Sequence, residues 1–195
     1  MVWGLKYSLK EGYKYLLVCW AEKMELKKYC RDGMYILRLI VVVVLLWPLS
    51  SFSTIKADLV VVDKSHAKLF LKKQGKVIKE FHVVFGENPK GHKQQEGDER
   101  TPEGHYILDF KNPDSRFYKS IHISYPNEQD KARARAAGVD PGGLIMIHGQ
   151  KNDLGLFAGV VQNFNWTDGC IAVTNSEMDE IWNAVDEGTP IEILP

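Results

Sequence analysis

The most informative stretch of this chain is Trp166-Thr167-Asp168-Gly169-Cys170-Ile171-Ala172-Val173-Thr174-Asn175. Its cysteine follows a flexible Asp-Gly pair and precedes apolar residues that favour strands, so the backbone can bend and present the sulfur at a strand edge. A second short motif, Ile147-His148-Gly149, lies about twenty residues upstream and puts an imidazole in the same position at the end of an apolar run. The sequence therefore predicts two short strands, one with a thiol at its edge and the other with an imidazole at its end.

On both sides of these motifs, hydrophobic and polar residues alternate as they do in β-strands. Hydrophobic alternation, separated by turn residues, predicts strands at 59–63, 67–71, 77–85, 106–110, 121–125, 144–147 and 190–194, of which the first three form an antiparallel meander. Residues 86–100 are polar and glycine-containing and are expected to form a surface loop, and 112–117 to form a turn.

Helical signals are few. They predict a helix at 128–137 that stops at Gly138, one or two turns within 155–164, and a helix at 177–185 capped by Asn175 or Ser176. With 195 residues and 45% hydrophobic content, we expect a single mainly β domain of the α+β class with a few short helices.

The amino-terminal part differs from the rest. An uncharged apolar run of about eleven residues at 39–49 follows basic residues and precedes Ser51-Phe52-Ser53, which is typical of a secretion signal and short for a membrane span. We expect an extension at 1–33, a signal peptide or membrane anchor at 34–53, and a catalytic domain at 56–195. Met24 and Met34 are alternative translation starts. The segment 34–53 can be a cleaved signal or an uncleaved anchor. Either way, the carboxy-terminal domain is expected outside the cytoplasmic membrane, with membrane contact only through the amino-terminal segment.

The cysteines and the charge balance limit which classes of function the sequence supports. Cys19 and Cys30 lie in the extension, so Cys170 is the only cysteine after the signal and is a candidate reactive thiol, with an inert buried cysteine as the alternative. The 25 Lys and Arg residues balance the 25 Asp and Glu residues, so no overall field would attract nucleic acid.

A thiolate attacks acyl carbonyls well, and a neighbouring imidazole can take the thiol proton and return it to a leaving amine. If the two strands are neighbours, Cys170 is a candidate nucleophile and His148 a candidate base. The backbone N–H groups of Gly169 and Cys170, with Asp168, are candidates for an oxyanion hole.

Several blocks resemble the L,D-transpeptidase catalytic domain (YkuD-like) family of bacterial cell-wall enzymes. They are His148-Gly149, 167–171 with Asn175, and the accompanying blocks 97–106, 112–118 and 121–127, all in the right order between 56 and 195. The resemblance implies a β-rich domain with Cys170 as nucleophile, His148 as base, Gly169 in the oxyanion hole, and neither metal nor organic cofactor. It implies an acyl-enzyme formed with the L-centre carbonyl of a diamino acid in a peptidoglycan stem peptide, with loss of a terminal D-amino acid. Together with the amino-terminal signal, this predicts an enzyme of the periplasm or cell envelope.

The sequence is compatible with more than one acyl acceptor. Cross-linking members have Ser/Thr-His-Gly-Cys and an Arg two residues later, whereas this chain has Asp168 and Ala172 at those positions. It thereby resembles a subgroup that includes hydrolases which detach an envelope lipoprotein. A second stem, a lipoprotein amine and water are all candidate acceptors, and a non-catalytic wall-binding module is the alternative to an enzyme.

Other residues are candidates for substrate contact. Arg116 can clamp a carboxylate, or it can pair with Asp114 or Asp140. His122 is expected near the site, and Gly149 belongs to the motif of the base. Trp166 is expected to pack near the site, and His66, His82, His92 and His105 to be ordinary surface or strand residues. A zinc site from His122, His148 and Cys170 is disfavoured because no closely spaced ligand pair exists.

Overall fold

A computed structural model describes residues 55–153 and 157–195. The expected extension at 1–33 and the expected signal or anchor at 34–53 lie outside these residues, as do Cys19 and Cys30. In the described ranges, no helix has the length and apolar character needed to cross a membrane.

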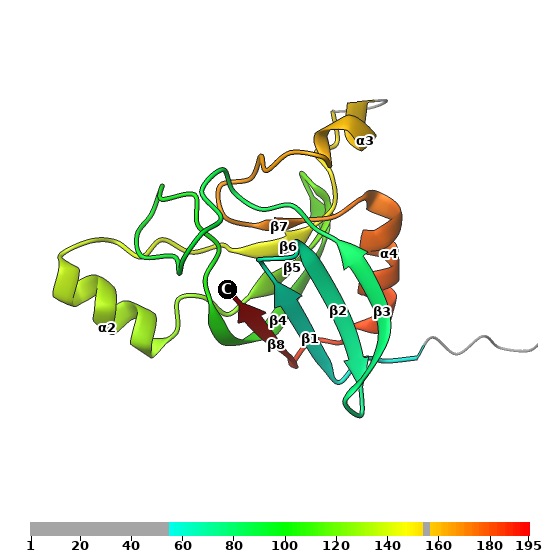
Figure 1. The fold of residues 1–195 in the computed structure, drawn as a ribbon, viewed down its shortest axis with the longest axis horizontal. Helices are drawn as coiled ribbons and strands as arrows, with labels where there is room; N and C mark the ends of the chain where they lie inside the picture. Colours follow the sequence, from blue (N-terminus) through cyan, green and yellow to red (C-terminus); the bar gives the residue numbers. More distant parts are fainter. Residues whose placement is uncertain (1–54, 154–156) are drawn as a thin grey trace, which may run out of the picture. The chain divides into compact units, whose positions relative to one another are not determined.

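The domain is built on one eight-stranded mixed sheet (Figure 1). The strands are β1 (Leu59–Asp63), β2 (Lys68–Lys73), β3 (Lys76–His82), β4 (Gly104–Ser115), β5 (Tyr118–Ile123), β6 (Met146–His148), β7 (Ile171–Ala172) and β8 (Thr189–Leu194). Their spatial order is β3-β2-β1-β8-β4-β5-β6-β7. The predicted β-rich α+β class and the antiparallel meander of β1, β2 and β3 are confirmed.

The last strand lies inside the sheet. β8 pairs in parallel with β1 and antiparallel with β4, so it joins the meander to the four strands that carry the site. Its residues alternate between buried and more exposed, with Ile191 and Ile193 each 1% exposed. This alternation turns one face of the strand to the core, as a strand in the middle of a sheet requires.

Three helices accompany the sheet. Helix α2 (Glu128–Ala137) has the predicted bounds and ends at Gly138, whose φ of 68° is left-handed. Helix α3 (Ala158–Val161) is the predicted short turn. Helix α4 (Asn175–Ala184) packs its apolar face, including Met178 and Ile181, into the core. In the view of Figure 1, α2 lies to the left of the strands and α4 to their right.

Two local predictions were wrong. The expected turn at 112–117 is mostly strand, because β4 continues to Ser115 and pairs with β5 there through an irregular register that accommodates Pro113. The cap of α4 is Thr174, whose Oγ1 accepts from the Glu177 N–H while the Glu177 carboxylate accepts from the Thr174 N–H at 2.9 Å. This capping box satisfies two backbone donors together, which Asn175 or Ser176 alone would not do.

Candidate active site

Cys170 and His148 come from adjacent parallel strands. Ile147 of β6 pairs with Ile171 of β7, and His148 pairs with Ala172. Cys170 precedes β7, so it lies one step before the Ile147–Ile171 pair, and His148 lies one step after it. The two isoleucines point into the core, which leaves His148 and Cys170 together on the other face of the sheet. The two strands are neighbours, which meets the condition under which the imidazole and the sulfur could approach each other.

The His148 side chain is enclosed and oriented. It is 3% exposed, and its Nδ1 lies 2.6 Å from the carbonyl oxygen of Gly149. A carbonyl only accepts, so Nδ1 carries the hydrogen and Nε2 presents a lone pair. The ring of Phe117 lies 4.5 Å from the imidazole and that of Trp166 lies 5.7 Å away, measured between ring centroids.

The imidazole is neutral at pH 7. Burial lowers the pKa of His148 to about 4, against the opposing effect of the hydrogen bond to the Gly149 carbonyl. A neutral imidazole with a free Nε2 is the form that can accept a proton. In the part of the chain that the structure describes, Nε2 makes no hydrogen bond.

The Cys170 thiol is protonated and partly buried. Its Sγ lies 3.6 Å from the carbonyl oxygen of Leu144. Burial is the main cause that raises the pKa of Cys170, and the Asp168 carboxylate raises it further, while a hydrogen bond to the Met146 backbone and the charge of Lys93 lower it. Since the net pKa is raised, the thiol keeps its proton at neutral pH. Within the described ranges, its hydrogen-bond partner is the Leu144 carbonyl, and no hydrogen bond joins Sγ to the His148 ring.

The turn before Cys170 is packed backbone against backbone. Gly169 has a φ of 114°, and a Cβ built on it would lie 2.5 Å from the carbonyl oxygen of Arg100. The Thr101 hydroxyl donates to the Gly169 carbonyl at 2.9 Å, and Thr167 Oγ1 donates to the Cys170 carbonyl at 2.8 Å. The segment before β4 thus fixes the position of the turn that presents the sulfur.

The Gly169 N–H is directed to Thr167 Oγ1 at 3.2 Å, and the Asp168 side chain is exposed. The expected contributions of Gly169 and Asp168 to an oxyanion hole stay predictions.

The segment 86–103 is less exposed than its composition predicted. Lys93 is 3% exposed and Thr101 is fully buried. The Lys93 ammonium lies 2.8 Å from a carboxylate oxygen of Asp98, whose two oxygens also accept backbone N–H groups of Gln94, Gln95 and Arg100. A polar sequence therefore forms an internally bonded support for the active-site turn.

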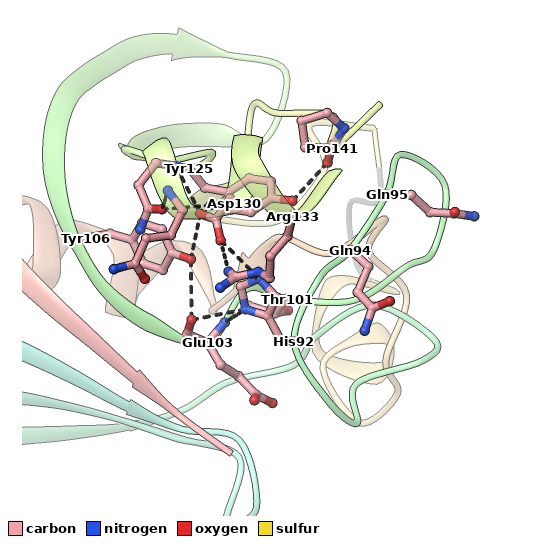
Figure 2. A network of polar contacts seen from close by, with 12 residues as sticks. His92, Gln94, Gln95, Thr101, Glu103, Tyr106, Tyr125, Asp130, Arg133 and Pro141 are labelled. Carbon is pink, nitrogen blue, oxygen red and sulfur yellow. Dashed lines mark hydrogen bonds and ion pairs between the residues drawn. The ribbon is translucent and has the colours of Figure 1, made fainter. Parts of the chain in front are cut away.

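A second polar network attaches this segment to α2 (Figure 2). The buried Asp130 carboxylate accepts from Tyr106 Oη at 3.0 Å and from the Asn127 N–H at 2.9 Å, and it pairs with Arg133 and with His92 Nε2. His92 was expected to be an ordinary surface residue, but its side chain is only 19% exposed and belongs to this network. A cavity of about 620 Å³ lies beside it, and neither Cys170 nor His148 lines that cavity.

Replacing Asp98 with asparagine tests the support. Burial raises the pKa of Asp98, but hydrogen bonds from Gln94 and Lys93 outweigh it, so the net pKa is lowered from 3.8. A lowered carboxyl pKa contributes stability that is present above the unfolded value and lost as the pH falls through the folded value. We expect Asp98→Asn to lower the free energy of unfolding by about 3 kcal/mol at neutral pH, because Lys93 stays buried without its counter-charge.

The measurement is urea denaturation at about pH 7 and about pH 3. The difference between the two proteins should shrink at the lower pH, where the natural carboxyl is protonating. The exposed Glu128→Gln is the matched control and should change stability by less than about 0.5 kcal/mol. An equal deficit of the Asp98 variant at both pH values would contradict the assignment.

The other candidates lie around the same region. Arg116 is exposed and forms no ion pair among the described residues, so the alternatives of pairing with Asp114 or Asp140 are not seen. His122 lies on the same sheet face as His148, where Met146 separates it from Cys170, and its Nδ1 is 2.7 Å from Asp109.

A side chain at Gly149 would force Asn175 to move, because a Cβ would lie 2.6 Å from Asn175 Oδ1, which accepts the Gln150 N–H at 2.8 Å. Asn175 thereby holds the turn after His148. In residues 55–153 and 157–195, no group of three or more His, Cys, Asp or Glu is arranged to hold a metal ion.

Sequence reasoning missed several residues around the site. Phe117, Leu144, Thr101, Lys93 and Ser120 contact or pair with site residues from strands and loops that are distant in sequence. Phe117 and Thr101 lie in blocks that carry the family resemblance, which gave them no role at the site. Trp166 was predicted to pack near the site, and its ring contact with His148 confirms this.

Comparisons with known proteins agree with this architecture. The model of the L,D-transpeptidase catalytic domain family, YkuD, matches residues 57–193. The Escherichia coli K12 protein named "Putative L,D-transpeptidase YafK" is 38% identical over 97 residues, which are 49% of this chain and 32% of that protein.

The crystal structure of the helical cell shape determining protein Pgp2 from Campylobacter jejuni is 28% identical with a TM-score of 0.53, and the match covers 69% of this chain and 46% of that one. A variant of Pgp2 gives 26% identity and a TM-score of 0.54, covering 73% and 48%. The chain thus matches about a third of YafK and about half of Pgp2.

Proposed function

The chain belongs to the L,D-transpeptidase catalytic domain family, YkuD, and from this premise we propose that it is an exported cysteine acyltransferase that acts on peptidoglycan stem peptides. The observation that carries the proposal is the pairing of a protonated thiol with a neutral, oriented imidazole on adjacent strands. Cys170 supplies the nucleophile and His148 the base, and the Gly149 carbonyl fixes which ring nitrogen is free.

The chemistry follows from these protonation states. His148 Nε2 takes the thiol proton, and the thiolate attacks the carbonyl carbon at the L-centre of a diamino acid in the stem. Backbone N–H groups at Asp168 and Cys170, with that of Gly169 once it leaves Thr167 Oγ1, are the proposed stabilisers of the resulting oxyanion. When the tetrahedral intermediate collapses, the imidazolium returns the proton to the amine of the departing D-amino acid, and a thioester on Cys170 remains.

The thioester is resolved by an acceptor. An amine of a second stem or of an envelope lipoprotein would give transfer, and water would give hydrolysis. The exposed Arg116 guanidinium, unpaired among the described residues, is proposed to hold a stem carboxylate, with His122 and Gly149 near the same substrate. We place the domain 56–195 in the periplasm or cell envelope, on the basis of the basic flank and apolar run of the amino-terminal segment.

The test is incubation of the purified protein with muropeptides, followed by mass spectrometry of the peptide that contains Cys170. We expect an acyl adduct on Cys170 and release of a D-amino acid, both absent in Cys170→Ala. Cross-linked products would assign a transferase and water-cleaved products a hydrolase. Binding without adduct or turnover, unchanged in Cys170→Ala, would overturn the enzyme assignment in favour of a wall-binding module.

A further inference from the structure

Ser120 of β5 lies directly opposite His148 of β6. The adjacent pair is bonded through its backbone, since the Gly149 N–H donates to the Lys119 carbonyl. Three positions along β5 in the other direction, the Ile123 N–H donates to the Ile145 carbonyl, which fixes the alternation. In this alternation Ser120 and His148 form a non-hydrogen-bonded pair, the type in which facing side chains approach most closely. Both side chains lie on the site face of the sheet, with Ser120 1% and His148 3% exposed.

The Ser120 hydroxyl is buried without a hydrogen-bond partner among the described residues. Such a group is uncommon in a folded protein, because it has lost its contacts with water and gained nothing in return. By contrast, Ser124, four residues later in the same segment, accepts the Ile107 N–H at 2.9 Å. A hydroxyl can both donate and accept, and its hydrogen rotates freely, so Ser120 can adapt to a neighbour that changes its protonation state.

His148 is such a neighbour. In the resting state Nδ1–H donates to Gly149, and Nε2 has no partner among the described residues. After proton transfer from Cys170, Nε2 carries a hydrogen in a buried site. That charged form has one acceptor at Nδ1 and, once the thiolate has attacked and no longer accepts from Nε2, needs a second acceptor there.

We propose that Ser120 is a positioning residue for His148, whose hydroxyl accepts a hydrogen bond from the imidazolium formed when His148 takes the proton of Cys170. The inference rests on the proposed function for its place in the reaction. The proton moves from Sγ to Nε2 and from Nε2 to the departing amine, and Ser120 neither gains nor loses a proton. Its hydroxyl holds the charged ring in place between the two transfers.

The titratable groups on the elements around His148 are mostly paired with one another. On β5, His122 pairs with Asp109, and Tyr118 and Lys119 both bond Asp179 of α4. Cys170 and Asp168 lie before β7, and Lys93 lies in the segment that supports the Gly169 turn. Burial and the Gly149 carbonyl are the causes that act on the pKa of His148 itself. A neutral hydroxyl opposite the ring is therefore expected to have a measurable effect.

The test measures alkylation of Cys170 by iodoacetamide at about pH 7, followed by mass spectrometry of the Cys170 peptide in the full chain. This reaction needs the thiolate but no peptidoglycan, so it reports on the Cys170–His148 pair independently of the substrate. We expect Ser120→Ala and Ser120→Val to react about tenfold more slowly, as for loss of a hydrogen bond to a charged group. Ser120→Thr, which matches valine in shape and retains the hydroxyl, should react at the natural rate.

Two controls separate positioning from packing. Ser124→Ala removes a partnered hydroxyl and should leave the alkylation rate unchanged. In a His148→Ala background, Ser120→Ala should have no further effect, because the group it serves is gone. A natural rate in both Ser120→Ala and Ser120→Val, or an undiminished Ser120 effect in the His148→Ala background, would overturn the proposal. If muropeptides give no adduct while the Ser120 dependence persists, the proposed function fails and the positioning role stands.

Discussion

Replacing His148 with alanine is expected to slow acylation of Cys170 by about a hundredfold to ten-thousandfold, the usual contribution of a positioned general base. The reason lies in the two protonation states. The pKa of Cys170 is raised mainly by burial, so the thiol keeps its proton at pH 7, and His148 is the neutral acceptor on the adjacent strand. The measurement is the rate of adduct formation with muropeptides by mass spectrometry, alongside thermal unfolding to show that the variant is folded.

His122→Ala is the matched control for this experiment. It removes an imidazole from the same face of the sheet, but one that is bonded to Asp109 and separated from Cys170 by Met146. We expect a much smaller fall in the acylation rate, confined to substrate affinity. Acylation of a folded His148→Ala protein at the natural rate would remove His148 from the role of base.

Replacing Gly169 with alanine is expected to cost about 3–5 kcal/mol of unfolding free energy, a loss at the upper end for single substitutions. Two effects combine at this position. The φ of 114° is unfavourable for any residue with a Cβ, and that Cβ would lie 2.5 Å from the backbone oxygen of Arg100, which a side-chain movement cannot relieve. Urea denaturation measures the loss.

The matched control is Gly75→Ala. Gly75 has a φ of 76° and a Cβ there meets nothing within 4 Å, so only the conformational cost of about 1 kcal/mol applies. The difference between the two variants isolates the contact between the Cys170 turn and the segment before β4. Equal losses for Gly169→Ala and Gly75→Ala would show that this contact contributes nothing to stability.

Much of the fold could be predicted from local patterns. The alternation at 59–63 and the alanine-rich run before Gly138 each correspond to an observed element with the predicted bounds. The turn expected at Pro113 was wrong, because pairing with β5 continues the strand through an irregular register. The sheet order was not predicted, since the place of β8 between β1 and β4 depends on contacts between distant residues.

The candidate site, like the fold, was predicted only in part. The motifs identified Cys170 and His148 as partners, and the register of β6 and β7 confirms that their strands are neighbours. The sequence could not show that Ser120 faces His148, because that pairing depends on the register of β5 and β6. The polar composition of 86–100 predicted an exposed loop, whereas Lys93 is buried. Its burial depends on an ion pair with Asp98, and composition alone does not show that two residues of one segment pair with each other.

The position of β8 between β1 and β4 affects how the domain folds during its synthesis. Residues 59–63 and 104–108 are synthesised well before the strand that joins them, Thr189–Leu194, emerges. Until then β1 and β4 each present an unpaired edge next to apolar side chains, a state that invites pairing with other chains. We therefore expect the nascent chain to depend on chaperones until β8 has emerged, and the sheet that carries Cys170 and His148 to be completed only then.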